Sequence, residues 1–383
     1  MRPPSPVEMT NDFTRRFVLW IGGIWSVKNP LQVIDIARQL PELDFVVIGP
    51  SKDRALLEEF MRRKTANVRY LGAITGEAKT DLIRNCSAGL STSLRETFGW
   101  VPFEFLNEGK PIICPPLDSF RELYGALPDY ATTTADFVNQ LKRLRKNGFR
   151  TSVDAKALKK FREKYSLVKA ADSIIRKLSS RSITILARDT DPVSDYVTGF
   201  LLVDWQLWRN IHDRGIELRI ISNGSKFAIH FGLTKQTSVI PRIALLLKDK
   251  AEKLEGATRM STILVRKSLR LIIYVIEPMS YVHTLIRQRA ISKIILADGY
   301  AQIAAAILAK MFFRTKVVCL LHDDAFYRDI WDANSPLVWR IFSAALTWSL
   351  IRYADRIIVV SDTLRREILH FYPHSEKISL LWS

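Results

Sequence analysis

The sequence predicts an α/β protein with two doubly wound, Rossmann-like domains, each built on a parallel sheet. The chain has 383 residues, which is long enough for two domains of ordinary size. Short apolar segments alternate with longer amphipathic segments, and this order is typical of parallel strands that are covered by helices. A hydrophobic fraction of 48% with only 16 Gly and 16 Pro indicates a globular protein.

The first half of the chain begins with a strand and then alternates helix with strand. We expect its strands at Phe17–Ile21, Phe45–Ile48, Val68–Leu71, Gly89–Thr92 and Pro111–Cys114. Asn29 and Pro30 begin a helix over Leu31–Leu40, because proline is tolerated in the first turn of a helix. Helices rich in Lys and Arg follow from Thr134 to Leu178 and close this half.

The second half begins with the apolar segment Ser182–Leu186, directly after a short polar junction. Further strands are expected at Glu217–Ile221, Leu271–Ile276, Lys293–Leu296, Lys316–Leu321 and Arg356–Val360, with helices at Tyr196–Arg214, Ala301–Phe313 and Leu337–Tyr353. The sequence therefore predicts a polar extension over residues 1–14, a first domain over residues 15–180 and a second over residues 181–383.

A formal net charge of +18 requires an explanation. An anionic membrane surface and phosphate-bearing substrates are candidate partners, and a solvated basic surface is the simplest alternative. No basic motif with interleaved aromatic residues is present, so we expect no nucleic-acid partner. The basic run from Lys248 to Arg270 alternates with Leu and Ile, which fits either a contact with anionic lipid or a solvated helix face.

The three cysteines, Cys86, Cys114 and Cys319, are far apart and lie in or beside apolar segments. Their odd number and their surroundings favour reduced core thiols in a reducing compartment, and their spacing holds no metal-ligand pattern. Residues 1–14 are polar and lack the features of a signal peptide, and the longest apolar stretches are interrupted by charges. We expect a cytoplasmic protein, with peripheral attachment to the inner membrane face as a further hypothesis.

The segment from Ser91 to Pro116, STSLRETFGWVPFEFLNEGKPIICPP, holds the pattern most informative about function. Glu96 and Glu104 stand on either side of Gly99, where an extended run ends and a helix begins. The N–H groups of a first helical turn lack partners inside the helix and lie at the positive end of its dipole, so they bind phosphate well. A diphosphate on this turn, with carboxylates for sugar hydroxyls on both sides, describes a nucleotide-sugar site.

This segment resembles the donor-binding half of GT-B glycosyltransferases of the retaining family 4, whose signature is Glu-x7-Glu followed by Gly-x-Pro. The resemblance covers roughly residues 15–178 and recurs in order along the chain. Its matching segments are Trp20-Ile21-Gly22-Gly23 with Lys28, Val46-Val47-Ile48-Gly49, Val68-Arg69-Tyr70-Leu71-Gly72, and Glu96 through Pro111. It implies two GT-B domains and transfer of a hexose from a nucleotide-diphosphate sugar to an acceptor hydroxyl, without a metal or another cofactor.

The resemblance also implies roles for individual residues. Glu104 would bind the ribose and Glu96 the transferred sugar, while the amides of Phe98, Gly99 and Trp100 would face the sugar and the diphosphate. Gly22 and Gly23 would lie beside the donor. Their loop leads to Lys28, at the position of the family's phosphate-binding lysine. The alternative for each charged residue is an ordinary solvated side chain.

The chain departs from the family at Gly23, where relatives usually carry an arginine. Losing this guanidinium removes a charge-assisted clamp on the phosphates, and each such hydrogen bond contributes about 1.5–3 kcal/mol. Arg95, beside Glu96, is a candidate replacement. A catalytically inactive nucleotide-sugar-binding protein is therefore an alternative function.

The second half resembles the acceptor-side domain of the same family, through Val317–His322 with Asp323 and Asp324, and through Ala354–Ser361. His322 would lie at the carboxyl end of its strand and contact the donor sugar, and Asp323 or Asp324 would assist the acceptor hydroxyl as a base. The pattern Asp189-Thr190-Asp191 resembles a metal motif of another fold, but it follows a Rossmann-type strand. It is better explained as a cap of the helix expected near Val193 or as a contact with the acceptor.

The order of the halves is the reverse of the usual order, in which the acceptor domain comes first. A circular permutant and a fusion of pieces of two enzymes both explain this order, and we favour a single two-domain unit. A subunit or remnant that supplies a domain to a partner glycosyltransferase is the remaining alternative. The acceptor is expected to be a glycan or a lipid-linked molecule.

Overall fold

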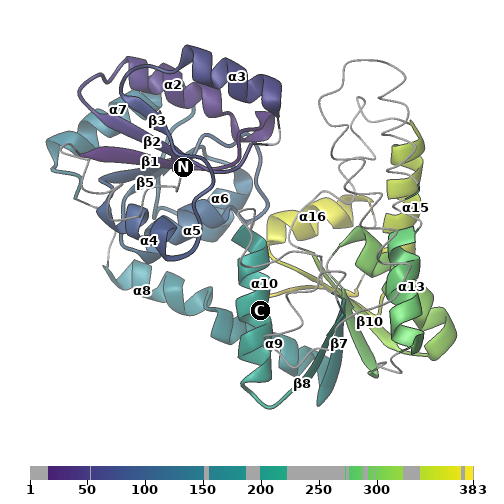
Figure 1. The fold of residues 1–383 in the computed structure, drawn as a ribbon. Coiled ribbons are helices and arrows are strands. Elements are labelled where there is room, and N and C mark those ends of the chain that lie inside the picture. Colours follow the sequence, from purple (N-terminus) through teal and green to yellow (C-terminus); the bar gives the residue numbers. More distant parts are fainter. Residues whose placement is uncertain are drawn as a thin grey trace. The chain divides into compact units, whose positions relative to one another are not determined.

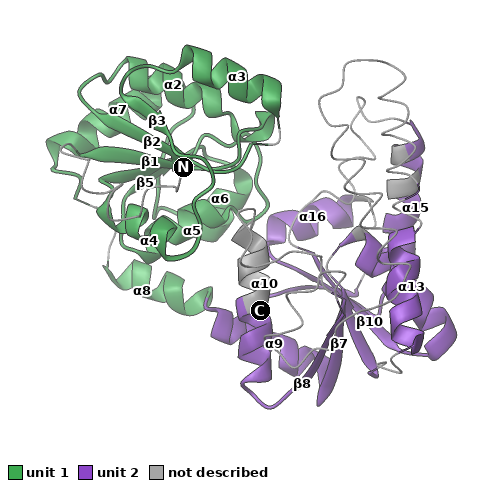
Figure 2. Ribbon diagram, in the orientation of Figure 1, with its two compact units in different colours: residues 1–165 green, residues 166–383 purple. Residues whose placement is uncertain are grey.

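The computed structural model describes residues 16–51, 53–150, 155–186, 199–221, 272, 276–287, 292–297, 299–321, 337–371 and 376–382. Two compact units divide the chain, one ending at Tyr165 and one beginning at Ser166 (Figure 2). Each unit contains one sheet with six described strands, all parallel. The predicted fold class, two Rossmann-like α/β halves, is confirmed.

The first sheet has the strand order β3-β2-β1-β4-β5-β6. Its strands are β1 (Phe17–Ile21), β2 (Asp44–Ile48), β3 (Val68–Tyr70), β4 (Ala88–Leu90), β5 (Ile112–Cys114) and β6 (Asp129–Tyr130). Its helices are η1 (Ser26–Lys28), α2 (Pro30–Arg38), α3 (Arg54–Arg63), α4 (Gly76–Asn85), α5 (Trp100–Asn107), α6 (Asp118–Tyr124), α7 (Thr134–Lys146) and α8 (Ala155–Lys164). Figure 1 shows α2, α3 and α7 on one face of this sheet and α4, α5 and α6 on the other.

Helices cover both faces of the first sheet, so its central strands are buried on both sides. Phe17, Val18, Leu19 and Trp20 of β1 are all buried, although alternate residues point to opposite faces. The chain leaves β1 toward β2 on one side and reaches β4 on the other. The strand order therefore reverses between β1 and β4, where open α/β sheets bind ligands beyond the carboxyl ends of the strands.

The second sheet has the order β12-β11-β10-β9-β7-β8. Its strands are β7 (Ser182–Leu186), β8 (Glu217–Ile221), β9 (Ile294–Ala297), β10 (Lys316–Leu321), β11 (Arg356–Val359) and β12 (Ile378–Leu380). Its helices include α9 (Leu167–Leu178), α10 (Gly199–His212), α13 (Tyr300–Phe313), α15 (Leu337–Tyr353) and α16 (Asp362–Phe371), and residues 276–287 are also helical. Helix α9 packs against α10, and α13 packs against α15 (Figure 1).

Nearly all predicted elements are confirmed within one to three residues, and helix Leu337–Tyr353 has the predicted bounds. The strand predicted at Leu271–Ile276 is wrong, because its described positions, Ile272 and Ile276, are helical. Periodicity alone does not separate a short apolar strand from a buried helical segment, and here the helix continues to residue 287.

The division between the compact units places α9 with the second unit. Its buried face is formed by Ala170, Ala171, Ile174 and Leu178, and Lys177 Nζ donates to the carbonyl oxygen of Leu380 at 2.8 Å. The functional boundary between residues 180 and 181 stays a prediction. In the part of the chain that the structure describes, no helix combines the length and the apolar composition needed to cross a membrane.

Candidate functional site

The loops after β1 and β4 meet at the carboxyl edge of the first sheet, where the strand order reverses. β1 and β4 are hydrogen-bonded neighbours, with Trp20 paired to Leu90. The loop after β1 leads through η1 to α2, and the loop after β4 leads to α5. The amide of Leu94 donates to the carbonyl oxygen of Val27 at 2.8 Å, so the two loops are joined directly.

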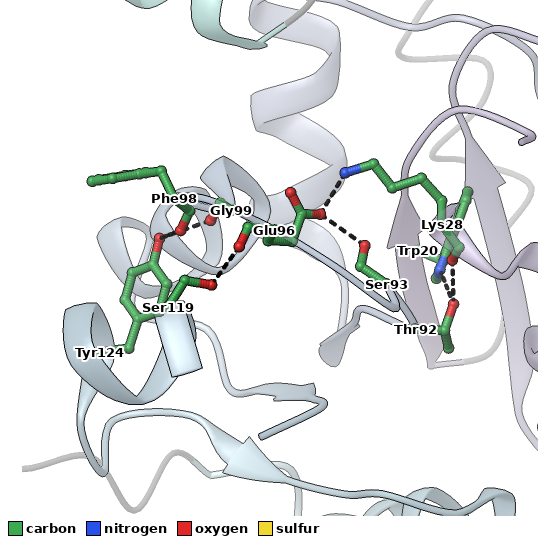
Figure 3. Close-up of polar contacts among 9 residues, drawn as sticks. All are labelled: Trp20, Lys28, Thr92, Ser93, Glu96, Phe98, Gly99, Ser119 and Tyr124. Carbon is green, nitrogen blue, oxygen red and sulfur yellow. Dashed lines mark hydrogen bonds and ion pairs between the residues drawn. The ribbon is translucent and has the colours of Figure 1, made fainter. Parts of the chain in front are cut away.

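An ion pair between Lys28 and Glu96 connects the same two loops (Figure 3). The side chains are 21% and 15% exposed, so both are partly shielded from water but open to a ligand. Ser93 Oγ donates to the same carboxylate oxygen of Glu96 at 2.8 Å. The structure thus brings together the lysine and the first glutamate that the sequence analysis assigned to the donor.

Thr92 fixes the backbone that carries Lys28. Trp20 Nε1, at the end of β1, donates to Thr92 Oγ1 at 3.0 Å. The hydroxyl in turn lies 2.9 Å from the carbonyl oxygens of Lys28 and Asn29. Because Thr92 and the Trp20 ring are buried, this link is shielded from water and holds the end of η1 against β4.

Helix α5 begins with Gly99 as its N-cap, in the left-handed conformation (φ 71°, ψ 73°). A Cβ at this position would lie 2.0 Å from Phe120 Cε1, so glycine is required both by the backbone and by the space. The backbone therefore turns sharply between Glu96 and the helix. The first-turn N–H groups of α5 have no partner inside the helix.

Helix α6 supports this turn from behind through two side chains (Figure 3). Ser119 Oγ donates to the carbonyl oxygen of Glu96 at 2.7 Å. The Tyr124 hydroxyl lies 3.1 Å from the carbonyl oxygen of Phe98 and 2.7 Å from that of Gly99. In a trans peptide the N–H points opposite to the C=O, so the amides of Gly99 and Trp100 face away from Tyr124.

Burial raises the pKa of Tyr124 well above its ordinary value, because the phenolate would lose its hydration. Nearby Cys114 and Glu96 raise this pKa further, since a second negative charge would be repelled. Tyr124 therefore remains a neutral hydrogen-bond donor over the physiological pH range. It acts as a structural support for the start of α5.

Glu104, one turn into α5, pairs with Lys79 of α4. Lys79 Nζ lies 2.6 Å from Glu104 Oε1, and the side chains are 16% and 23% exposed. The other carboxylate oxygen, Oε2, is buried and has no hydrogen-bond partner in the described structure. One oxygen of Glu104 is thus held by a lysine, and the other is an unsatisfied acceptor.

The two glycines after β1 have crowded surroundings. Gly22 donates to the carbonyl oxygen of Ile48 at 3.0 Å, which extends the pairing of β1 with β2. A Cβ at Gly23 would lie 1.8 Å from the ring of Trp25. The Trp25 ring therefore fills the space that the side chain of an arginine at position 23 would need. Arg95, the candidate replacement, is exposed at the surface beside Glu96.

The Phe98 side chain belongs to the core and only its backbone can face a ligand. It is 1% exposed and its ring centroid lies 4.2 Å from that of Trp100, which is half-buried. Tyr124 and Tyr165 contact the same ring edge-on at 6.3 and 6.0 Å. This aromatic cluster anchors the residue before Gly99.

Several predicted residues lie outside the described structure. They are His322, Asp323 and Asp324, the Asp189–Asp191 pattern, and the basic run from Lys248 to Arg270. Among the described residues, no group of three or more His, Cys, Asp or Glu is arranged to hold a metal ion.

Sequence reasoning missed the residues that hold the predicted ones in place. These are Lys79, Thr92, Ser93, Ser119 and Tyr124. Ser93 lies three residues before Glu96, the spacing of a local side-chain contact, and this signal was available. The others lie on separate elements, so no local pattern in the sequence could have identified them.

Comparisons with known proteins agree with this architecture. Residues 7–127 match the family model of Glycosyl transferases group 1, and residues 205–382 match that of Glycosyltransferase Family 4. No curated protein matches the chain significantly.

Three solved structures illustrate the structural likeness. AviGT4, a glycosyltransferase involved in avilamycin A biosynthesis, is 20% identical over 42% of this chain and 51% of its own, with a TM-score of 0.33. Anabaena Alr3699/HepE, solved with UDP and glucose, is 18% identical over 46% and 51%, with a TM-score of 0.41. A point mutant of GsuK is 11% identical over 95% and 71%, with a TM-score of 0.30.

The chain spans about half the length of each of the first two structures. The family-model matches cover most of both units, in the order group 1 and then family 4. The chain belongs to the GT-B glycosyltransferases of the group 1 and family 4 type.

Proposed function

We propose that this family 4 type chain is a retaining glycosyltransferase that moves a hexose from a nucleotide-diphosphate sugar to an acceptor hydroxyl without a metal. The proposal rests on one observation, the arrangement of charged groups and a helix start at the carboxyl edge of the first sheet. There a lysine, two carboxylates and a glycine-capped helix start surround the point where the strand order reverses. This set of groups suits a diphosphate between two hydroxylated rings.

The departing nucleoside diphosphate develops negative charge, and stabilising this charge is the largest task of the protein. The amides of Gly99 and Trp100 face away from their support on α6, and they lie at the positive end of α5. Lys28 supplies a full positive charge from the neighbouring loop. Ser119 and Tyr124 hold the backbone at the start of α5 in place before the ligand arrives, so its amides require little rearrangement.

The pair between Lys28 and Glu96 suggests how the site changes on binding. Without ligand, each charge neutralises the other. A diphosphate competes for the Lys28 ammonium, and Glu96 is then released to accept hydrogen bonds from hydroxyls of the transferred sugar. Ser93 keeps the carboxylate in place during this exchange.

Glu104 is suited to bind the ribose. Lys79 holds its Oε1, while its Oε2 is buried and unsatisfied, a state that costs about 1–3 kcal/mol. A ribose hydroxyl that reaches Oε2 would remove this penalty. The same requirement would select ribonucleotides over deoxyribonucleotides.

The second unit would supply the acceptor side, by resemblance alone. His322 would contact the donor sugar, and Asp323 would assist the acceptor hydroxyl as a base. Retention would follow front-side attack, in which the leaving phosphate helps to deprotonate the acceptor. No covalent intermediate on a carboxylate is required.

The acceptor is proposed to be a glycan or a lipid-linked molecule. The basic run from Lys248 to Arg270 would bring an anionic membrane close, and the protein would work in the cytoplasm, at the inner membrane face. These assignments rest on the sequence pattern.

Calorimetry with UDP-, GDP- and ADP-sugars, followed by a donor-hydrolysis assay, tests the proposal. Binding of one nucleotide class together with turnover supports it. Binding without turnover would favour an inactive nucleotide-sugar-binding protein, an alternative suggested by Gly23 and by the Trp25 ring beside it. Absence of binding would favour a subunit that supplies a domain to a partner transferase.

Two substitutions test the assigned residues. Glu104→Ala should weaken nucleotide binding, whereas Glu108→Ala at the C-cap of the same helix, which removes a carboxylate paired with Arg84, should not. His322→Ala should lower turnover more than affinity. If Glu104→Ala and Glu108→Ala bind the nucleotide with equal affinity, Glu104 does not bind the ribose.

Small-angle scattering tests whether the two halves form a single working unit. A circular permutant should give one compact particle with two lobes around a cleft. An elongated pair of separated lobes would favour a fusion of two unrelated pieces.

A further inference from the structure

A row of basic residues runs along the amino edge of the second sheet. In five of its six described strands, the first residue or the one before it is basic: Lys377 (β12), Arg356 (β11), Lys316 (β10), Lys293 (β9) and Arg181 (β7). All five are exposed, and their strands are consecutive in the sheet. We call this set the amino-edge row.

Backbone hydrogen bonds show that the members of the row are neighbours. The amide of Lys316 donates to the carbonyl oxygen of Lys293 at 2.8 Å, and the amide of Ile357 donates to that of Lys377 at 2.9 Å. Adjacent strands are about 5 Å apart, so the row places one positive charge on each successive strand. Among its acidic neighbours, Asp355 is paired with Lys310, and Glu217 with Arg219. Glu376 is also exposed at this edge.

One member of the row, Arg356, lies near enough to Lys177 of α9 to contribute to its electrostatic surroundings. The pKa of Lys177 is lowered, first by burial and then by repulsion from Arg176 and Arg356. Lys177 Nζ also donates to the carbonyl oxygen of Leu380, the last residue of β12.

Apolar side chains are exposed next to the row, at the carboxyl ends of α13 and α15. They are Met311 (66% exposed), Phe312 (72%), Phe313 (37%), Trp348 (50%) and Tyr353 (39%). We call these five residues the apolar end. Lys310 Nζ donates to the Tyr353 carbonyl oxygen at 2.7 Å, which ties the two helix ends together.

The composition of these helices matches an anionic partner. Neither α13 nor α15 contains an Asp or Glu, and their charged residues are Lys310, Arg340 and Arg352. Arg352 lies over the ring of Trp348 at 5.2 Å and near that of Tyr353 at 6.0 Å. Trp and Tyr with nearby Arg are typical of side chains at a membrane–water interface.

We propose that the amino-edge row and the apolar end together form a docking surface for an anionic lipid bilayer. The basic residues contact lipid headgroups, and the apolar end enters the interfacial layer without crossing the membrane. A second copy of the chain fits less well, because it would bring like-charged rows together. Single-stranded nucleic acid also fits less well, because Arg352 already covers aromatic faces on which bases would stack.

Flotation of the full chain with lipid vesicles tests this surface. The chain should bind vesicles that contain phosphatidylglycerol, should not bind pure phosphatidylcholine, and should be released as salt is added. Lys293→Glu with Lys316→Glu should lower the partition coefficient about thirtyfold or more, because each basic residue near such a surface changes it about fivefold. Lys159→Glu with Lys160→Glu, an equal charge change on α8, is the matched control and should change binding less than about twofold.

The apolar contribution is tested separately. Phe312→Ser should lower the partition coefficient about tenfold. Met61→Ser, which removes a 45% exposed apolar side chain from α3, should leave it unchanged. Circular dichroism and nucleotide binding of all four variants should equal those of the unaltered chain, which separates this test from that of the proposed function.

Three outcomes would overturn the proposal. One is equal loss of vesicle binding in the two charge-reversal variants. Another is a dimer that Phe312→Ser dissociates, without vesicle binding, which would assign the surface to a second copy. The third is binding of an RNA oligonucleotide through Lys293 and Lys316 while vesicles remain unbound.

Discussion

The two sheets have the same parallel architecture, but the two sets of charged residues to which we assign a function lie at opposite edges. In the first unit, Lys28, Glu96, Lys79 and Glu104 form ion pairs near the carboxyl edge, between loops and helices that side chains hold in place. In the second unit, the amino-edge row lies at the other end of the strands and its members are exposed, with Lys377 Nζ also donating to the carbonyl oxygens of Ile351 and Arg352.

This difference separates two kinds of charged site. Paired and partly buried charges suit a small ligand. We propose that a diphosphate replaces Glu96 as the partner of Lys28, and that a ribose hydroxyl binds the Glu104 oxygen that Lys79 does not hold. An exposed row of one sign cannot order a small ligand but attracts an extended anionic surface. Fold alone therefore does not determine which edge of a parallel sheet is used.

The largest expected effect tests whether the first edge is held in place by packing. Gly99→Ala should lower the free energy of unfolding by about 3 kcal/mol, from left-handed strain and from overlap with Phe120. Gly148→Ala has a similar φ of 67° but open space around its Cβ, so it should cost only about 1–2 kcal/mol. Urea denaturation measures both, and equal losses would show that packing against Phe120 is unimportant.

Lys28→Met tests whether the first edge, and not the general positive charge, binds the nucleotide. The affinity for a nucleoside diphosphate should fall about tenfold to a hundredfold, because a charge-assisted contact is lost. The exposed Lys142→Met on α7 removes the same charge and should leave the affinity unchanged. Calorimetry measures these affinities. A similar loss of affinity in both variants would indicate that the nucleotide is attracted nonspecifically by the positive charge of the protein.

Thr92→Val sharpens the comparison by removing a buried link at the first edge. The indole N–H of Trp20 and two carbonyl oxygens lose their partner, so the free energy of unfolding should fall by about 2 kcal/mol. Thr80→Val, which removes a 3.3 Å bond to Gly76, should change it by less than about 0.5 kcal/mol. If thermal or urea denaturation shows no difference between the two, Thr92 does not fix this loop.

The prediction with the smallest effect near pH 7 concerns a buried thiol of the first unit. Burial raises the pKa of Cys86 from 9.0 to about 12, and Lys110 partly offsets this. Above pH 9 the unfolded chain loses a proton that the folded chain keeps, so the free energy of unfolding falls as pH rises. The loss is at most about 1.4 kcal/mol per pH unit up to about pH 12.

Cys86→Ala should remove this part of the slope between pH 9 and about 12 and leave the slope near pH 7 unchanged. Denaturation curves recorded across this range provide the measurement. Identical alkaline slopes in the two proteins would show that the thiol is not the titrating group.

Much of the fold and the centre of the candidate site could be predicted from the sequence, because both depend on local patterns. Strand and helix periods placed nearly every element, and the sequence around Gly99 located the helix start. The short segment Leu271–Ile276 was misassigned because its apolar run fits a helix as well as a strand.

The supports of the site could not be predicted, because they depend on contacts between distant residues. Lys79 lies 25 residues before Glu104, and Tyr124 reaches back to Gly99 from another helix. The amino-edge row could not be recognised in the sequence for the same reason. Five basic residues spread from 181 to 377 become neighbours only when the strand order is known.

A crystal structure of the chain with bound UDP is the most direct test of the central claim. The account predicts phosphate oxygens on the amides of Gly99 and Trp100 and near Lys28 Nζ, with a ribose hydroxyl at Glu104 Oε2. UDP bound away from the start of α5, with the Lys28–Glu96 pair intact, would contradict it.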